Sequence, residues 1–179
     1  MANTDAGYYQ RLIAPIEDRM MRTIWRIVRD TDDADDALQE ALATVWKRLE
    51  RIRSHPNPHA VILRICVNAA YDLLRRKIRE RRRRELHAIA DSRADTKPSA
   101  RDVLSHEERE TEIFDAIARL SRNQAQAVLM RLVQGQCYSD IAQALGCSEA
   151  TARIHVTRGR ARLRKLLSHL APHPLKEVP

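Results

Sequence analysis

The sequence predicts an all-α protein made of two small helical domains joined by a flexible linker, and three observations support this fold class. Aromatic residues make up only 4% of the chain, which gives a β-sheet few side chains to pack with. Ala, Leu, Arg and Glu, which favour helices, are plentiful. Apolar residues recur every three or four positions in several separate segments. The length of 179 residues allows one ordinary domain or two small ones.

The first domain, residues 8–86, is expected to contain three helices. The first runs from about Tyr8 to Arg29, because its apolar residues form one stripe at helical spacing. The break at residues 30–32 supplies an N-cap for a second helix, whose exposed face is acidic near its start. A proline-containing loop follows, and the third helix begins near His59.

The third helix carries a buried apolar stripe and a separate polar stripe that can follow a nucleic-acid strand. Its end, residues 75–84, has eight basic positions in ten, and like charges four residues apart destabilise an isolated helix. An anionic partner relieves this repulsion, whereas the plainer interpretation is a solvated helix end. The polar stripe consists of Arg64, Asn68, Tyr71, Arg75 and Arg79.

The apolar period disappears over residues 87–105, which contain three acidic and three basic residues and are expected to form a flexible linker. The second domain, residues 106–170, opens with an acidic helix, and Ser121 is expected to cap the next one. Residues 171–179 are a proline-rich tail, expected to be disordered. Because each domain can bury only a modest core, both are expected to gain stability from a partner.

The second domain also contains the spacing of a helix-turn-helix motif. A short helix at about 138–145 is followed by a tight turn at Gly146, and Ser148 caps a longer helix that starts at Glu149. The longer helix is strongly basic, so its first half suits a major groove and its later arginines suit phosphates. This pattern predicts DNA binding, and the alternative is a structural helical hairpin.

The formal net charge of +8 is unevenly distributed. Residues 1–50 carry −3, residues 51–84 carry +9, residues 85–120 carry −4 and residues 121–179 carry +6. Of the 32 basic residues 27 are Arg, whose planar guanidinium suits phosphate oxygens and guanine edges, although genomic base composition produces the same bias. Two basic segments therefore alternate with two acidic ones.

Several classes of protein are not expected. The four scattered glycines cannot form a phosphate-binding loop or a dinucleotide fingerprint, and no apolar run reaches the roughly 20 residues that cross a bilayer. The N-terminus lacks the apolar core of a signal peptide and the three cysteines form no C-x-x-C pair, so a cytoplasmic protein with reduced thiols is expected. His55 and His59 stand in a proline-broken loop, and the aspartates of residues 32–36 fit helix capping. No metal, cofactor or enzymatic activity is therefore predicted, including that of a metal-dependent hydrolase.

Three segments together resemble the bacterial RNA polymerase sigma factors of the extracytoplasmic-function (ECF) group. DDADDALQEALATVWKRL is similar to the family's D-x-A-E-D-x-x-Q-E-x-F-x-x-x-W, and LRICVNAAYDLLRRKIR is similar to L-x-R-I-A-x-N-x-x-x-D-x-x-R-R. The segment from LSRNQ to LRKLL follows the family's region 4 pattern, which includes Y-x-E-I-A-x-x-L-G-x-S. The resemblance covers nearly the whole chain. It implies a region 2 domain and a region 4 domain in a transcription initiation factor that acts without hydrolysing anything.

The resemblance also implies a partner for each surface. Core RNA polymerase, through its β and β′ subunits, would bind Asp36, Gln39 and Glu40. Asn68 would read a flipped base of the minus-ten element, because its amide offers a donor and an acceptor. Neighbouring strand and phosphate contacts would come from Arg64, Tyr71, Arg75 and Arg76. The minus-thirty-five element would be read by Arg153, His155, Thr157 and Arg158. An anti-sigma factor is implied as a further partner.

The chain departs from the family pattern at several positions. Residues 51–63 contain none of the usual aromatic side chains, and Ile62 stands where the family places a Trp. Ile154 occupies a position that is often small and polar. The alternative function is a stand-alone helix-turn-helix regulator with an N-terminal dimerisation or sensor module, which would not associate with core polymerase.

Overall fold

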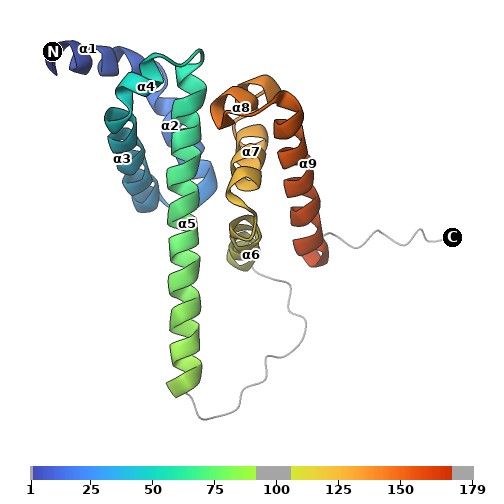
Figure 1. Cartoon of the computed structure of the whole chain (residues 1–179). Helices are drawn as coiled ribbons and strands as arrows, with labels where there is room; N and C mark the ends of the chain where they lie inside the picture. Colours follow the sequence, from blue (N-terminus) through green and yellow to red (C-terminus); the bar gives the residue numbers. More distant parts are fainter. Residues whose placement is uncertain (1, 92–105, 171–179) are drawn as a thin grey trace.

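The computed structural model describes residues 2–91 and 106–170 (Figure 1), and every element in these ranges is helical. The first part contains α1 (Ala2–Ile13), α2 (Glu17–Val28), α3 (Thr31–Lys47), α4 (Leu49–Arg53) and α5 (Pro58–Asp91). The second contains α6 (His106–Ala118), α7 (Arg122–Leu132), α8 (Tyr138–Leu145), α9 (Glu149–Leu166) and a 3₁₀ turn (Ser168–Leu170). The prediction of an all-α fold with two helical domains is confirmed.

Some helix boundaries differ from the prediction. The single helix expected up to Arg29 is two helices, because Pro15 lacks a backbone N–H and the chain turns there. Asp30 caps α3 as predicted, with its carboxylate accepting a hydrogen bond from the Asp33 N–H at 2.9 Å. Ser121 stands at the N-cap of α7, but its hydroxyl accepts no capping hydrogen bond. Helix α5 continues to Asp91, into the segment predicted as linker, and the predictions for 92–105 and 171–179 lie outside the described residues.

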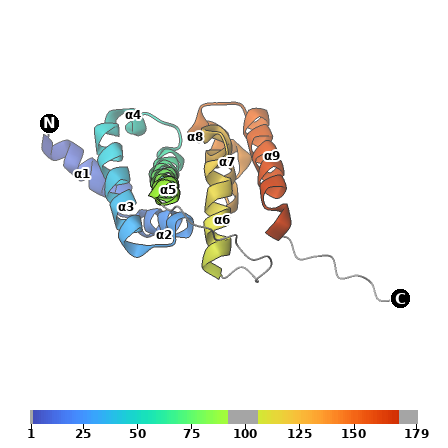
Figure 2. The same ribbon diagram turned by 90° about the horizontal axis from the view of Figure 1, so that it is seen from below.

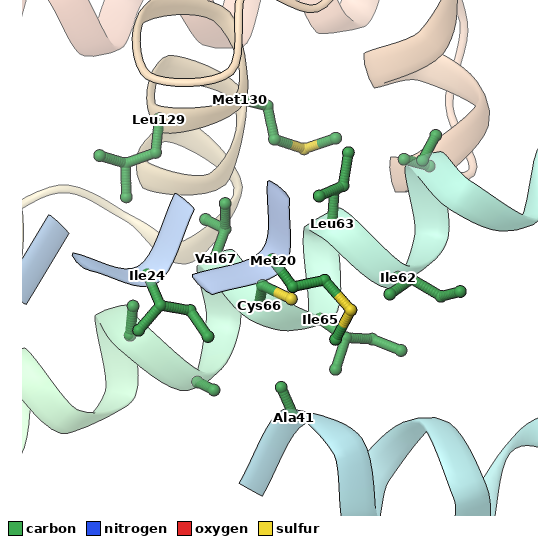
Figure 3. Packing of buried hydrophobic residues seen from close by; sticks show 14 of the residues in the cluster. Met20, Ile24, Ala41, Ile62, Leu63, Ile65, Cys66, Val67, Leu129 and Met130 are labelled. Carbon is green, nitrogen blue, oxygen red and sulfur yellow. The ribbon is translucent and has the colours of Figure 1, made fainter. Parts of the chain in front are cut away.

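Helix α5 lies at the centre of the described structure. Viewed along its axis, it has α2 and α3 on one side and the helices of the second domain on the other (Figure 2). Figure 3 shows Leu63 and Val67 of α5 on the side of Leu129 and Met130 of α7, while Ala41 of α3 lies on the opposite side of α5. These residues are all buried and belong to one hydrophobic cluster, so the two domains share a core.

Polar contacts also join the domains. The Tyr71 hydroxyl donates to the Leu120 carbonyl at 2.9 Å, and the Gln134 amide donates to the Leu63 carbonyl at 3.1 Å. Arg81 of α5 pairs with Asp115 of α6 at 2.6 Å. Further hydrogen bonds between the domains join Arg26 to the Val133 carbonyl at 3.0 Å and Asn57 to Asp140 at 3.1 Å. We call this packing of the second domain on α5 the closed arrangement.

Candidate nucleic-acid interface

The turn between α8 and α9 has the geometry of a helix-turn-helix motif. Gly146 ends α8 in the left-handed conformation, with φ 68° and ψ 40°, where a side chain would be strained. The Cys147 N–H donates to the Ala142 carbonyl at 3.0 Å and closes the turn. The Ser148 hydroxyl then accepts from the Thr151 N–H at 3.1 Å and begins α9. The predicted positions of the turn and of both helices are therefore confirmed.

The orientation of α9 depends on a close approach to α7. A Cβ atom added at Gly159 would lie 2.5 Å from a methyl carbon of Val128, which is closer than real Cβ contacts allow. Ala152 and Val156, on the same side of α9, are buried. Because these residues hold one face of α9 against the domain, the opposite face points to solvent over the length of the helix.

The solvent face of α9 carries the predicted DNA-reading residues. Arg153, Thr157 and Arg158 are exposed, and His155 is half-buried. The Arg153 guanidinium lies 4.4 Å from the centre of the Tyr138 ring and donates to Glu149 at 3.1 Å, which limits its freedom before any ligand binds. An arginine whose planar guanidinium is held in position can form two hydrogen bonds with guanine in the major groove.

Ile154 also lies on the exposed side of α9, and sequence reasoning did not include it among the candidate residues. Ile154 stands between Arg153 and His155 and is 46% exposed. An apolar side chain on a groove-facing surface can contact the methyl group of thymine. The sequence already indicated that Ile154 is exposed, because the helical period places position 154 outside the buried apolar stripe of α9.

Helix α3 presents the predicted acidic surface. Asp36, Gln39 and Glu40 are all exposed and share one face of the helix, because they stand three and four residues apart. Asp33 does not belong to this free surface, since its carboxylate pairs with Lys77 of α5. The arrangement suits a basic protein surface.

The candidate residues of α5 divide into a buried part and an exposed part. Tyr71 is fully buried, and Asn68 and Arg64 are half-buried. Neither the side-chain oxygen of Asn68 nor the Nε of Arg64 has a hydrogen-bond partner among the described residues, and both atoms are shielded from solvent. Arg75 lies 5.7 Å from the centre of the Tyr71 ring and is exposed, as is Arg76. In the closed arrangement, therefore, DNA cannot reach the inner part of this set.

A basic cavity of about 160 Å³ lies where α4 and α5 meet the end of α8. Its charged lining consists of Arg48, Arg51 and Arg64, with His55 beside them and no carboxylate in the lining. Burial and the positive charges of Arg48 and Arg51 lower the pKa of Arg64 below its usual value. Sequence reasoning missed Arg48 and Arg51, because they come near Arg64 only through the fold.

His55, in the loop before α5, has a local structural role. The His55 ring accepts a hydrogen bond from the Asn57 N–H at 3.0 Å, and the Asn57 side chain accepts one from the Ala60 N–H at 3.1 Å at the start of α5. Within the part of the chain that the structure describes, no three His, Cys, Asp or Glu side chains gather as metal ligands. The same residues include no helix with the length and apolarity that a membrane span requires.

Comparison with known proteins relates both domains to one family. Residues 12–80 match sigma-70 region 2 and residues 110–163 match sigma-70, region 4. The chain is 34% identical over 142 residues to the ECF RNA polymerase sigma factor SigM of Mycobacterium tuberculosis, covering 79% of this chain and 68% of SigM. It is 30% identical over 166 residues to the RNA polymerase sigma factor CarQ of Myxococcus xanthus, covering 90% of each.

A solved structure shares the fold. The sigma factor RpoE of Bartonella quintana, crystallised with the anti-sigma factor NepR, is similar with a TM-score of 0.51 at 22% identity. The similarity covers 89% of this chain and 96% of RpoE. At this level of identity the likeness concerns the arrangement of helices.

Proposed function

Because the chain belongs to the family of ECF RNA polymerase sigma factors, a family of promoter-recognising transcription initiation factors, we propose a specific division of labour among its helices. Helix α3 binds core RNA polymerase through Asp36, Gln39 and Glu40. Helix α5 contacts the minus-ten element through Asn68 and the arginines beside it. Helix α9 reads the minus-thirty-five element from its exposed face.

The observation that carries this function is the presence of both sigma-70 regions, region 2 before region 4, in one chain. A stand-alone helix-turn-helix regulator would account for α8 and α9 only. It would leave unexplained the exposed acidic face of α3 and the amide of Asn68, whose buried oxygen has no hydrogen-bond partner in the described residues. An amide with a free acceptor can bond the Watson–Crick edge of an extruded base.

In this proposal the closed arrangement is the form without DNA. Tyr71 and the Asn68 oxygen become accessible only when the second domain leaves α5, which breaks the Tyr71 to Leu120 hydrogen bond. Binding of polymerase and promoter then supplies the free energy that separates the domains. The protein itself hydrolyses nothing and acts in the bacterial cytoplasm, where core polymerase and promoter DNA are found. An anti-sigma factor is the proposed inhibitor, in analogy to the RpoE complex.

Runoff transcription with purified core polymerase tests the function. A specific transcript from a promoter of the cognate genome, dependent on this chain, supports it, and the absence of any such transcript from all candidate promoters contradicts it. Asn68→Ala is expected to reduce promoter opening, measured by permanganate reactivity of unpaired thymines, while binding to core polymerase is unchanged. Equal loss of both properties would assign Asn68 to the fold instead.

A further inference from the structure

The basic cavity between α4, α5 and the end of α8 has the composition of an anion site, and no proposed contact with DNA or polymerase uses Arg48 or Arg51. Its volume is about 160 Å³. Figure 1 shows α4 and α8 near the N-terminal end of α5, so the first domain supplies one wall and the second domain the other. The polar lining from the first domain is Arg48, Arg51, His55 and Arg64, and the second domain contributes residues 143–146.

The positive charge of this cavity is not balanced within the protein. Among the described residues, no carboxylate lies within 4.0 Å of the guanidinium groups of Arg48, Arg51 or Arg64. The carbonyls at the C-terminal end of α8 offset part of this charge, and together the three guanidinium groups and the helix end leave an excess of about 2.5 positive charges. A dianion would balance most of this excess.

Arg64 is the arginine of this set for which a ligand matters most. It is half-buried, and its Nε is shielded from solvent and has no hydrogen-bond partner among the described residues. Burial and the positive charges of Arg48 and Arg51 lower its pKa. Because a buried donor without a partner costs free energy, a negatively charged acceptor in the cavity would stabilise the protein both by its charge and by its hydrogen bonds.

Two further side chains add donors to the cavity. The Nδ1 of His55 accepts a hydrogen bond from the Asn57 N–H at 3.0 Å, so the proton of the neutral ring is on Nε2. On the opposite wall, the side-chain amide of Gln143 can donate as well. Donors from both domains therefore line one space, and a ligand with several acceptor oxygens can bond both walls at once.

The volume of the cavity restricts the ligand to a small ion. Pockets for drug-sized ligands begin at about 300 Å³, whereas a cavity of about 150 Å³ holds a molecule the size of benzene. Orthophosphate is no larger than benzene, carries up to two negative charges near neutral pH and presents acceptor oxygens in every direction. A nucleotide or a nucleic-acid strand is too large for the cavity to enclose.

We propose that this cavity binds a free tetrahedral oxyanion with the size and charge of orthophosphate. The anion contacts guanidinium groups of the first domain and the end of α8 together, so it binds the closed arrangement and favours closure by mass action. The site does not depend on the proposed contacts with DNA or polymerase. Its consequence rests on the proposed function, in which the closed arrangement is the form without DNA: the anion opposes promoter binding.

Equilibrium dialysis of the full chain with radiolabelled inorganic phosphate tests the site, with the ionic strength held constant by KCl. The site variant carries Arg48→Gln and Arg51→Gln, both at exposed positions. The matched control carries Arg160→Gln and Arg162→Gln, which removes the same charge from the exposed basic surface of α9. Circular dichroism verifies that all three chains are folded. Adenosine 5′-monophosphate, which carries its phosphate as an ester, is added as a competitor.

The wild-type chain and the control are expected to bind phosphate saturably and with equal affinity. The site variant is expected to lose about tenfold or more in affinity, because hydrogen bonds between charged groups contribute at least that factor. Adenosine 5′-monophosphate is expected to compete poorly, since the cavity has no room for the nucleoside.

A second measurement reports the arrangement of the domains. Single-molecule energy transfer between a dye on α2 and a dye on α9 gives the ratio of closed to open molecules. If only closed molecules bind the anion, phosphate at about ten times its dissociation constant raises this ratio about tenfold. The rise is expected in the wild-type chain and in the control, and the site variant is expected to lack it at the same phosphate concentration.

Four results would overturn the proposal. The first is the absence of saturable phosphate binding by the wild-type chain. The second is an equal loss of affinity in the control, which would indicate a general charge effect. The third is effective competition by adenosine 5′-monophosphate, which would indicate a phosphate ester as the ligand. The fourth is an unchanged ratio of closed to open molecules at saturating phosphate, which would place the anion on one domain only. Because neither measurement involves DNA or polymerase, failure of the proposed function in runoff transcription is distinguishable from failure of the anion site.

Discussion

The closed arrangement predicts that hydrogen bonds remote from any proposed contact with DNA or polymerase control the separation of the domains. Arg26→Gln combined with Gln134→Ala removes two such bonds, to the carbonyls of Val133 and Leu63. The Arg26 bond is exposed and contributes about 0.5 kcal/mol, whereas the partly buried Gln134 bond contributes about 1 kcal/mol. The sum of roughly 1.5 kcal/mol raises the ratio of open to closed molecules about tenfold.

Single-molecule energy transfer measures this ratio directly. Dyes are attached to cysteines introduced by Arg19→Cys on α2 and Arg164→Cys on α9, both exposed positions on different domains. The background carries Cys137→Ser and Cys147→Ser, since Cys137 is exposed and Cys147 is partly so.

A matched pair of substitutions gives the control. Arg22→Gln with Gln10→Ala makes the same chemical changes at exposed residues. Among the described residues, Arg22 forms an ion pair with Asp18 on its own helix and with no residue of the second domain. An equal rise of the low-transfer population in the two pairs, or no rise in either, would refute control of domain separation by these two hydrogen bonds.

Further predictions concern single residues. Arg153→Ala is expected to cost about 1–3 kcal/mol of binding to the minus-thirty-five element, measured by fluorescence anisotropy, whereas equal loss on unrelated DNA would assign Arg153 to phosphate contact. Gly159→Ala is expected to destabilise the fold by about 1–3 kcal/mol in thermal unfolding, because the new Cβ overlaps Val128, and an unchanged melting temperature would contradict that overlap. Burial raises the pKa of the Cys66 thiol from 9.0 to about 12, so iodoacetamide at neutral pH is expected to modify Cys137 and spare Cys66 in mass spectra until the chain unfolds. Between pH 9.0 and about 12 this thiol is protonated in the folded chain and ionised in the unfolded chain. Its contribution to the free energy of unfolding therefore falls as the pH rises through this range. Cys66→Ala is expected to abolish this fall.

The helix-turn-helix motif was predictable because its determinants are local. Gly146 adopts a positive φ, and Ser148 accepts a hydrogen bond from a residue three positions later. The N-cap at Asp30 was predictable for the same reason. The break at Pro15 was also available from the sequence, since proline interrupts a helix, but the continuous apolar stripe concealed it.

The packing between the domains could not be derived in the same way. A helical period shows that α5 has a polar stripe, but it does not show what covers that stripe. Tyr71 was expected to contact a nucleic acid, and in the closed arrangement it is instead buried with its hydroxyl on the Leu120 carbonyl. The cavity formed by Arg48, Arg51 and Arg64 likewise depends on tertiary contacts between helices.

The shared core has a consequence for how promoter strength varies among related chains. Leu63 and Val67 of α5 are covered by Leu129 and Met130 of α7, and separation of the domains exposes all four to water (Figure 3). In the proposed function only open molecules bind DNA, so the cost of that exposure is subtracted from the affinity for every promoter. Substitution of a core methionine or leucine can therefore raise or lower transcription from a whole regulon at once. Determinants of output thus extend to residues that never contact DNA, and comparisons of promoter-reading side chains alone will miss them.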